Sequence, residues 1–210
     1  MVLTGVKDYQ SQFKEPKEQV RSVKKILILA ADPKTTVRLR LDEEARDIGE
    51  GLRQAKHREQ FVISSKLAVR LRDLRRVLLD FEPNIVHFTG HGKENGLLVE
   101  DELGFAALIS TKTLSGLFEL FSDHIECVIL STCYSARQAA AIKKHINYVI
   151  GMRKEIGAKA SIEFSVGFYD ALGSGRYVED AFKFGRNAIQ QKFPDLSERL
   201  LPLLIKKNDE

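Results

Sequence analysis

The sequence predicts an α/β fold, a three-layer α/β/α sandwich with a mostly parallel central sheet. Short apolar runs alternate with amphipathic helical patterns along the 210 residues, an order typical of βαβ units. The apolar runs are continuous, which is typical of strands buried on both faces. Hydrophobic residues make up 43% of the chain, enough for one good core, so a single domain is the simplest interpretation.

The first half of the chain predicts three strands joined by two helices. The strands are expected at residues 25–30, 61–64 and 85–88. The first helix has one apolar face, made by Leu41, Ala45, Ile48 and Leu52. The second helix, which ends before Pro83, has an apolar face made by Leu67, Leu71, Leu74 and Leu78. This order is βαβαβ.

The second half continues the alternation. A hairpin or short strand is expected around 96–99, and strands at 127–130 and 148–151. An alanine-rich helix, 136–144, separates those two strands. The other helices are marked by apolar residues at helical spacing: Leu114, Leu117, Phe118 and Phe121, then Ile162, Val166 and Tyr169, then Val178, Phe182 and Ile189. Gly173 is the expected C-terminal cap between the last two.

The sequence predicts one domain with polar ends. We expect a polar leader or linker at 1–23, the domain at 24–205 and a polar tail at 206–210.

Composition indicates where such a protein works. No apolar stretch is long enough for a membrane span, and the first residues contain no apolar signal-peptide centre, so a soluble, cytoplasmic protein is expected. Two cysteines, Cys127 and Cys133, are too few for a disulfide framework. The net charge of +4 comes from surfaces of mixed sign, so no direct nucleic-acid contact is expected.

Two segments carry the chemistry that the sequence predicts. His87-Phe88-Thr89-Gly90-His91-Gly92 and Ser131-Thr132-Cys133-Tyr134-Ser135 each follow or end a strand-like run. The carboxyl ends of parallel strands meet at one edge of a sheet, where open α/β sheets place their ligand sites. We therefore expect His91 to act as base and Cys133 as nucleophile, with the amides of Gly90, Gly92 and Cys133 available to stabilise the oxyanion. Taken singly, His91 could be a turn residue and Cys133 a small buried one.

Other polar residues have simpler interpretations beside their functional ones. His87, His91 and Cys133 could be imagined as zinc ligands, but no fourth ligand suggests itself, so no metal and no cofactor are expected. Arg70, Arg72, Arg75 and Arg76 flank an apolar helix face and are most simply a solvated surface.

The order of these motifs resembles the CHAT branch of the caspase-like clan, which also contains caspases, separases and gingipains. The resemblance rests on the strand before His-Phe-x-Gly-His-Gly and on the strand ending in Thr-Cys-Tyr-Ser before an alanine-rich helix. It also rests on the closing stretch, residues 162–186. The resemblance implies a caspase-like peptidase domain with a dyad of His91 and Cys133 and with Gly92 as an oxyanion donor. It further implies a bacterial origin, a protein substrate and control by a sensor module, a regulatory protein or a fused domain, in antiviral defence or stress signalling.

One position departs from the wider clan. Members that cut after basic residues often carry an acidic residue two places before the cysteine, and this chain has Ser131 there. A strong preference for arginine or lysine is therefore not expected unless Asp32 or another carboxylate fills the pocket floor. Asp32 is a candidate substrate-binding residue or a turn residue beside Pro33. Arg153 and Glu155 are candidate substrate-binding residues, or parts of a solvated loop.

Three classes of function are compatible with the sequence. The first is a cysteine endopeptidase, and the second is a catalytically silent caspase-like interaction domain. The third, a flavodoxin-like nucleotide-binding module, is disfavoured because residues 31–35 contain no glycine-rich phosphate cradle. Only a short helical connection separates Cys133 from Tyr148, so we expect activation without chain cleavage. A partner would instead reshape the loops near Cys133, at 152–155 and at 101–110.

Overall fold

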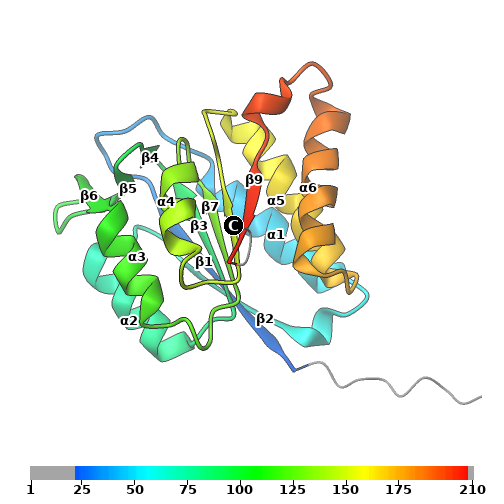
Figure 1. The fold of residues 1–210 in the computed structure, drawn as a ribbon, viewed down its shortest axis with the longest axis horizontal. Coiled ribbons are helices and arrows are strands. Elements are labelled where there is room, and N and C mark those ends of the chain that lie inside the picture. The colour runs from blue at the N-terminus through cyan, green and yellow to red at the C-terminus, as the bar shows by residue number, and fades with distance from the viewer. Residues whose placement is uncertain (1–21, 208–210) are drawn as a thin grey trace, which may run out of the picture.

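A six-stranded sheet forms the middle layer of the computed structural model, which describes residues 22–207 (Figure 1). The strand order is β2-β1-β3-β7-β8-β9. The strands are β1 (Lys24–Ala31), β2 (Phe61–Lys66), β3 (Ile85–Gly90), β7 (Cys127–Ser131), β8 (Tyr148–Gly151) and β9 (Leu203–Lys206). The first five pair in parallel, and β9 runs antiparallel to β8. The predicted, mostly parallel central sheet is confirmed.

Helices cover both faces of this sheet. In Figure 1, α2 (Leu71–Phe81), α3 (Thr111–Glu119) and α4 (Ala136–Ile142) lie on one side of it. The other side carries α1 (Leu41–Gln54), α5 (Ala158–Gly173) and α6 (Val178–Lys192). Alternate residues of the inner strands β1, β3, β7 and β8 contribute to two separate apolar cores, as with Leu27 on the α2 side and Ile28 on the α1 side. The three-layer sandwich is thus confirmed.

A small antiparallel sheet is inserted between β3 and α3. It consists of β4 (Gly92–Lys93), β5 (Gly96–Glu100) and β6 (Ala106–Ser110), in that order. The sequence pattern predicted only a hairpin or short strand in this region. Two short 3₁₀ helices, Arg58–Gln60 and Glu198–Leu200, complete the secondary structure of the described residues.

Three local predictions differ from the structure. The second helix begins at Leu71 rather than Leu67, because Ala68 has a positive φ of 54° and Asp73 caps the helix by accepting from the backbone of Arg70. Gly173 is the last residue of α5 instead of its cap, and the positive φ after that helix, 87°, belongs to Gly175. The strand β9 has no counterpart among the predicted elements, since its pairing depends on β8 and not on a local pattern.

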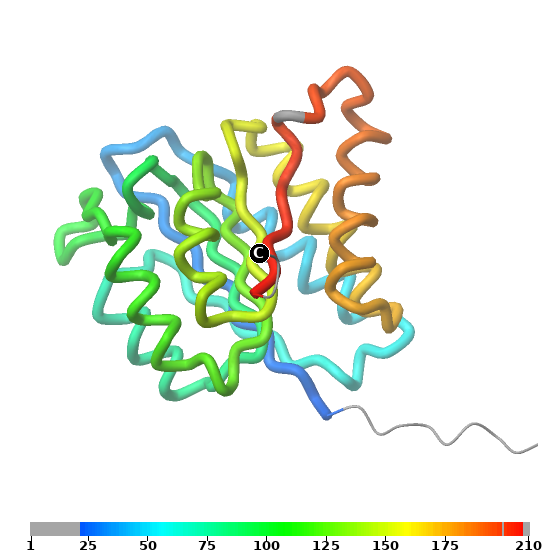
Figure 2. Tube along the Cα trace, in the orientation of Figure 1, coloured from blue at the N-terminus to red at the C-terminus, as the bar shows by residue number. Residues whose placement is uncertain are grey.

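Figure 2 follows the described chain to its end after β9, the edge strand of the sheet next to β8. Most of the predicted leader (residues 1–21) and residues 208–210 of the predicted tail lie outside the described residues, while Lys206 is the last residue of β9. Between residues 22 and 207 no helix is both long and apolar enough to cross a membrane.

The space around two helical glycines predicts opposite effects on stability when each is replaced by alanine. Gly185 lies where α6 packs closely on α5, and Gly116 lies on an open part of α3. A Cβ at Gly185 would stand 2.7 Å from the Phe164 carbonyl oxygen, whereas a Cβ at Gly116 on α3 would meet nothing within 4 Å. Gly185→Ala should lower the free energy of unfolding by about 1–3 kcal/mol through overpacking. Gly116→Ala should raise it by about 0.5–1 kcal/mol by restricting the unfolded chain.

Urea denaturation of both variants and of the wild type measures these changes. Equal stability of the two variants would contradict the described helix packing.

Candidate active site

Three polar residues follow neighbouring strands at one edge of the sheet. Asp32 comes directly after β1, His91 directly after β3, and Cys133 two residues after the end of β7. Ala31 of β1 pairs with Gly90 of β3, and Thr89 pairs with Ser131 of β7. The chain therefore delivers Asp32, His91 and Cys133 to the same edge, as parallel strands require.

Two glycines let the backbone segments of this edge approach closely. Gly90 has φ of 149°, and a Cβ there would stand 2.5 Å from the Ala31 carbonyl oxygen. A Cβ at Gly92 would stand 2.2 Å from the carbonyl oxygen of Cys133. The turn that carries His91 therefore lies directly against the loop that carries Cys133, and neither glycine tolerates a side chain without movement.

The Cys133 loop is held by a buried serine at the start of α4. The Ser135 hydroxyl lies 2.8 Å from the Thr132 carbonyl oxygen and 3.0 Å from that of Leu130, to which it can donate, and it accepts from the Met152 amide at 2.9 Å. Further along α4, the Gln138 side-chain amide donates to the Lys93 carbonyl at 2.8 Å. These bonds tie the cysteine loop to the segment after β8 and tie α4 to β4.

His91 is oriented by the segment between β1 and α1. Its Nε2 lies 2.8 Å from the Val37 carbonyl oxygen and 3.7 Å from Asp32 Oδ1. A carbonyl oxygen only accepts, so Nε2 carries the proton and donates. In the neutral ring this leaves Nδ1 as the nitrogen that can accept a proton.

A cavity of about 270 Å³ opens at this edge, and both His91 and Cys133 line it. Ser131 and Glu155 line it as well, as do the apolar side chains of Val37, Leu39, Leu41, Met152, Ile156 and Ile162. Asp32 and Gly92 are not among its lining residues. Arg153 lines a different cavity, together with Arg186 and Glu198. The structure thus brings four of the predicted residues together and leaves Arg153 apart.

Glu44 also lines this cavity and is absent from the sequence-based candidates. It lies in the first turn of α1, is 3% exposed and accepts hydrogen bonds from the hydroxyls of three residues: Thr89, Ser131 and Ser165. Its only sequence signal is its spacing, because Glu44 stands four and eight residues before Ile48 and Leu52, on the buried face of the helix.

The two cysteines differ in exposure and acidity. Cys133 is partly buried, and burial together with the negative charge of Glu155 raises the pKa of its thiol. Cys127 is fully buried in β7, and burial raises its pKa far above the usual value. Of the two, Cys133 is the thiol that a reagent or substrate can reach.

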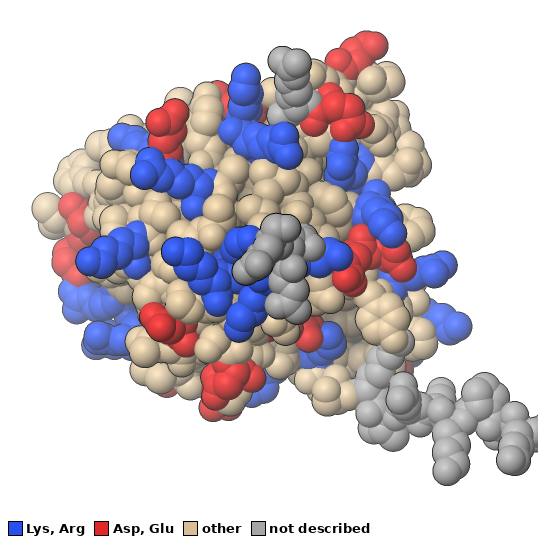
Figure 3. Space-filling model, in the orientation of Figure 1, with Lys and Arg blue, Asp and Glu red and all other residues tan. Residues whose placement is uncertain are grey.

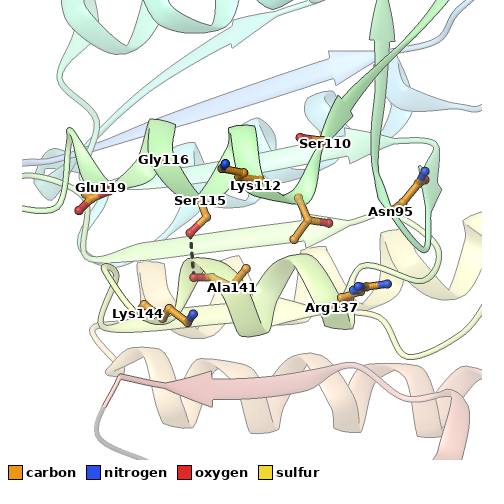
Figure 4. Close-up of a pocket in the computed structure, with 10 residues that line it drawn as sticks. Asn95, Ser110, Lys112, Ser115, Gly116, Glu119, Arg137, Ala141 and Lys144 are labelled. Atoms are coloured by element: carbon orange, nitrogen blue, oxygen red, sulfur yellow. Dashed lines mark hydrogen bonds between the residues drawn. The ribbon is translucent and has the colours of Figure 1, made fainter.

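A larger cleft, of about 620 Å³, lies between α3 and α4 (Figure 4). The Ser115 hydroxyl on α3 donates to the Ala141 carbonyl on α4, and Lys112, Arg137 and Lys144 stand around the bond. The residues that line this cleft include no cysteine and no histidine, so it does not compete as a nucleophilic site.

In the view of Figure 3, basic side chains are spread over the surface with acidic ones between them. Among residues 22–207, no three His, Cys, Asp or Glu side chains form a group that could hold a metal ion.

Comparison with known proteins gives a family match over most of the chain. The model of the CHAT domain family matches residues 6–195. A "Probable protease" of Gillisia limnaea is 26% identical over 202 residues, which cover 89% of this chain and 36% of that protein. A "Roc-COR-CHAT protease" of an unknown prokaryotic organism is 26% identical over 223 residues, covering 99% of this chain and 21% of that protein. The chain therefore spans about a third and a fifth of the length of these relatives.

Solved structures of cysteine proteases share the fold. A secreted C11 cysteine protease from Bacteroides thetaiotaomicron gives a TM-score of 0.64 at 12% identity, over 88% of this chain and 66% of that one. The Arg-specific proteinase gingipain R gives 0.62 at 13% identity, over 86% and 45%. The Drosophila initiator caspase Dronc gives 0.59 at 9% identity, over 90% and 82%. The fold is therefore caspase-like.

The charge of Glu155 predicts a change in the reactivity of Cys133. Glu155→Gln removes a negative charge that raises the pKa of the Cys133 thiol, so the pKa should fall and more thiolate should be present at pH 7. We expect alkylation by iodoacetamide at pH 7 to become about twofold to fivefold faster, because the thiolate is the reacting species. The difference should vanish at high pH, where the thiol is ionised in both proteins.

Mass spectrometry of the alkylated peptides measures the rate at Cys133, with buried Cys127 as an internal unreactive control. Glu163→Gln is the matched variant, since Glu163 pairs with Lys192 on the surface. A rate unchanged or lowered in Glu155→Gln would show that Glu155 does not act on this thiol.

Proposed function

This chain belongs to the CHAT domain family, and on that premise we propose that it is a cysteine endopeptidase with Cys133 as nucleophile and His91 as base. One observation carries the proposal: both side chains line a single cavity, at the edge where β3 and β7 end. The close contact of the Gly92 turn with the Cys133 loop supports it, because it leaves no space for a side chain between the two segments.

The reaction begins with proton transfer from the Cys133 thiol to His91 Nδ1. The thiolate then attacks the carbonyl carbon of the scissile peptide bond, and the carbonyl oxygen becomes an oxyanion. The backbone N–H groups of Gly92 and Cys133 are the proposed donors to that oxyanion. When the tetrahedral intermediate collapses, the imidazolium gives its proton to the leaving amine, and a thioester with Cys133 remains. Water activated by His91 hydrolyses this thioester and regenerates the thiol.

Two groups support the histidine in this cycle. The Val37 carbonyl accepts from Nε2 at 2.8 Å and holds the ring in the tautomer that leaves Nδ1 free to accept. Asp32 Oδ1 lies 3.7 Å from the same Nε2. Asp32 therefore serves the base rather than the substrate in this proposal, while Glu155 and Ser131 remain the proposed substrate contacts.

Control by an attached module or a partner completes the proposal. The 14 positions between Cys133 and Tyr148 contain α4 and a turn with the buried residue Ile146, so they offer no extended loop for self-cleavage. A relative carries the name Roc-COR-CHAT protease, and this chain matches 21% of it, which supports a domain that works beside others. The proposed setting is the bacterial cytoplasm, in defence or stress signalling, where a reducing environment keeps Cys133 a thiol.

Replacing Cys133 tests the peptidase directly. Cys133→Ala should reduce substrate cleavage roughly a thousandfold or more, because no other nucleophile replaces the thiol. The free energy of unfolding should change by less than about 1 kcal/mol, because the side chain is small and only partly buried. Proteomic comparison of cells that express the wild type or the variant, with the physical partner present, identifies the cleaved substrates.

The same samples report on activation. Intact mass of the wild-type chain should stay unchanged while substrate is cleaved. Equal cleavage by the two proteins would contradict the peptidase and favour a silent interaction domain. Activity that appears only after a cut between Cys133 and Tyr148 would contradict the proposed control.

A further inference from the structure

We propose that Glu44 selects the substrate: the cavity beside Cys133 takes the side chain of the residue before the scissile bond, and this side chain is arginine or lysine. The inference rests on the proposed function and names its substrate class. It identifies Glu44 as the carboxylate of the pocket floor, although position 131, two residues before the cysteine, is a serine.

The cavity has the shape and lining of a pocket for one long side chain. Its volume of about 270 Å³ lies just below the range of sites that enclose whole small molecules. Cys133 lines it, so a side chain inside it belongs to a residue next to the reacting bond. Leu41, Met152 and Ile162 are buried apolar walls, which suit the methylene stem of arginine or lysine.

The polar end of the cavity is the carboxylate of Glu44. This residue lines the cavity and is only 3% exposed, and the proposal places its carboxylate at the inner end. Ser131 and Ser165 donate to its Oε1 at 3.1 and 2.6 Å, and His87 Nε2 lies 3.3 Å from the same oxygen. Oε2 accepts one bond from protein, from the Thr89 hydroxyl at 2.5 Å. A carboxylate oxygen has two acceptor positions, so Oε2 retains one for a ligand.

This carboxylate keeps its charge despite burial. Burial acts to raise the pKa of Glu44, but the interaction with His87 and the hydroxyl donors outweighs it and lowers the pKa below its usual value. The three hydroxyls are neutral, so they solvate the charge without cancelling it. His87 Nδ1 also lies 3.2 Å from the Tyr169 hydroxyl. The carboxylate thus stays ionised beside the apolar walls, with His87 against Oε1 and the neutral Thr89 hydroxyl against Oε2.

The charge at the deep end discriminates among occupants. An apolar side chain would displace water from the carboxylate without supplying a partner, which is costly. An acidic side chain would be repelled. A guanidinium or ammonium group on an apolar stem satisfies both the walls and the carboxylate. Two cationic residues, Arg40 and Lys154, also line the cavity. Arg40 is exposed and paired with Glu43, and Lys154 is exposed and stands next to Glu155 in the chain.

The test compares two capped tripeptide amides that differ only in their last residue, arginine or citrulline. Citrulline has nearly the same shape as arginine and no charge. Binding is measured by calorimetry to the full chain carrying Cys133→Ala, so that no covalent chemistry intervenes. The arginine peptide should bind on the order of tenfold tighter or more, the size expected of a charge-assisted bond.

Two further variants locate the source of the preference. Glu44→Gln, nearly isosteric, should remove the preference, whereas Glu43→Gln, a neighbouring acid that pairs with Arg40, should retain it. Equal affinity for the two peptides, or binding of neither, would overturn the inference whatever the folding of Glu44→Gln. A preference that survives in folded Glu44→Gln would also overturn it.

Labelling of wild-type Cys133 by the matching peptidyl acyloxymethyl ketones separates this inference from the proposed function. The thiolate displaces the carboxylate leaving group and forms a thioether. Absence of labelling together with a retained binding preference would contradict the peptidase and support the pocket. Labelling at equal rates by both reagents would support the peptidase and overturn the role of Glu44.

Discussion

Parallel pairing of β3 with both β1 and β7 is the constraint on which the rest of the site depends. The register matches Ala31 with Gly90 and Thr89 with Ser131, so the three strands end at one level. Asp32 and His91 are the first residues after β1 and β3, and Cys133 is the second residue after β7. A shift of one residue would turn the strand side chains to the opposite faces and would separate these groups. The two apolar cores, which take alternate strand residues, therefore specify the register and with it the site.

Buried polar groups connect this edge to its surroundings. Ser135 joins the cysteine loop to Met152, and Glu44 joins α1 to β3, β7 and α5 through Thr89, Ser131 and Ser165. Each bond is worth about 1 kcal/mol, but a donor left without its acceptor in such a place costs more. Ser131 stands two residues before Cys133, so the carboxylate network and the nucleophile loop share a segment. A movement of the Glu44 carboxylate would therefore displace Ser131, which lies on the same segment as Cys133.

The sequence predicted the central sheet, the helices and the placement of His91 and Cys133 at one edge of the sheet, because these follow from apolar runs and from residues at strand ends. It could not identify Glu44, since Asp42, Glu43 and Glu44 are three consecutive acids in the first turn of α1 and only packing decides which one points inward. The Val37 carbonyl that orients His91 belongs to a backbone without any sequence pattern. Likewise, β9 forms because β8 offers it an edge, which is a long-range fact.

The pH dependence of Cys133 alkylation, measured with His91 present and with His91→Ala, tests most directly whether these two residues act as one unit. If His91 accepts the thiol proton, its loss raises the midpoint of the profile and slows alkylation at pH 7, while the rates converge at high pH. Profiles that coincide over the whole pH range would contradict the pairing of His91 with Cys133, and with it the proposed chemistry.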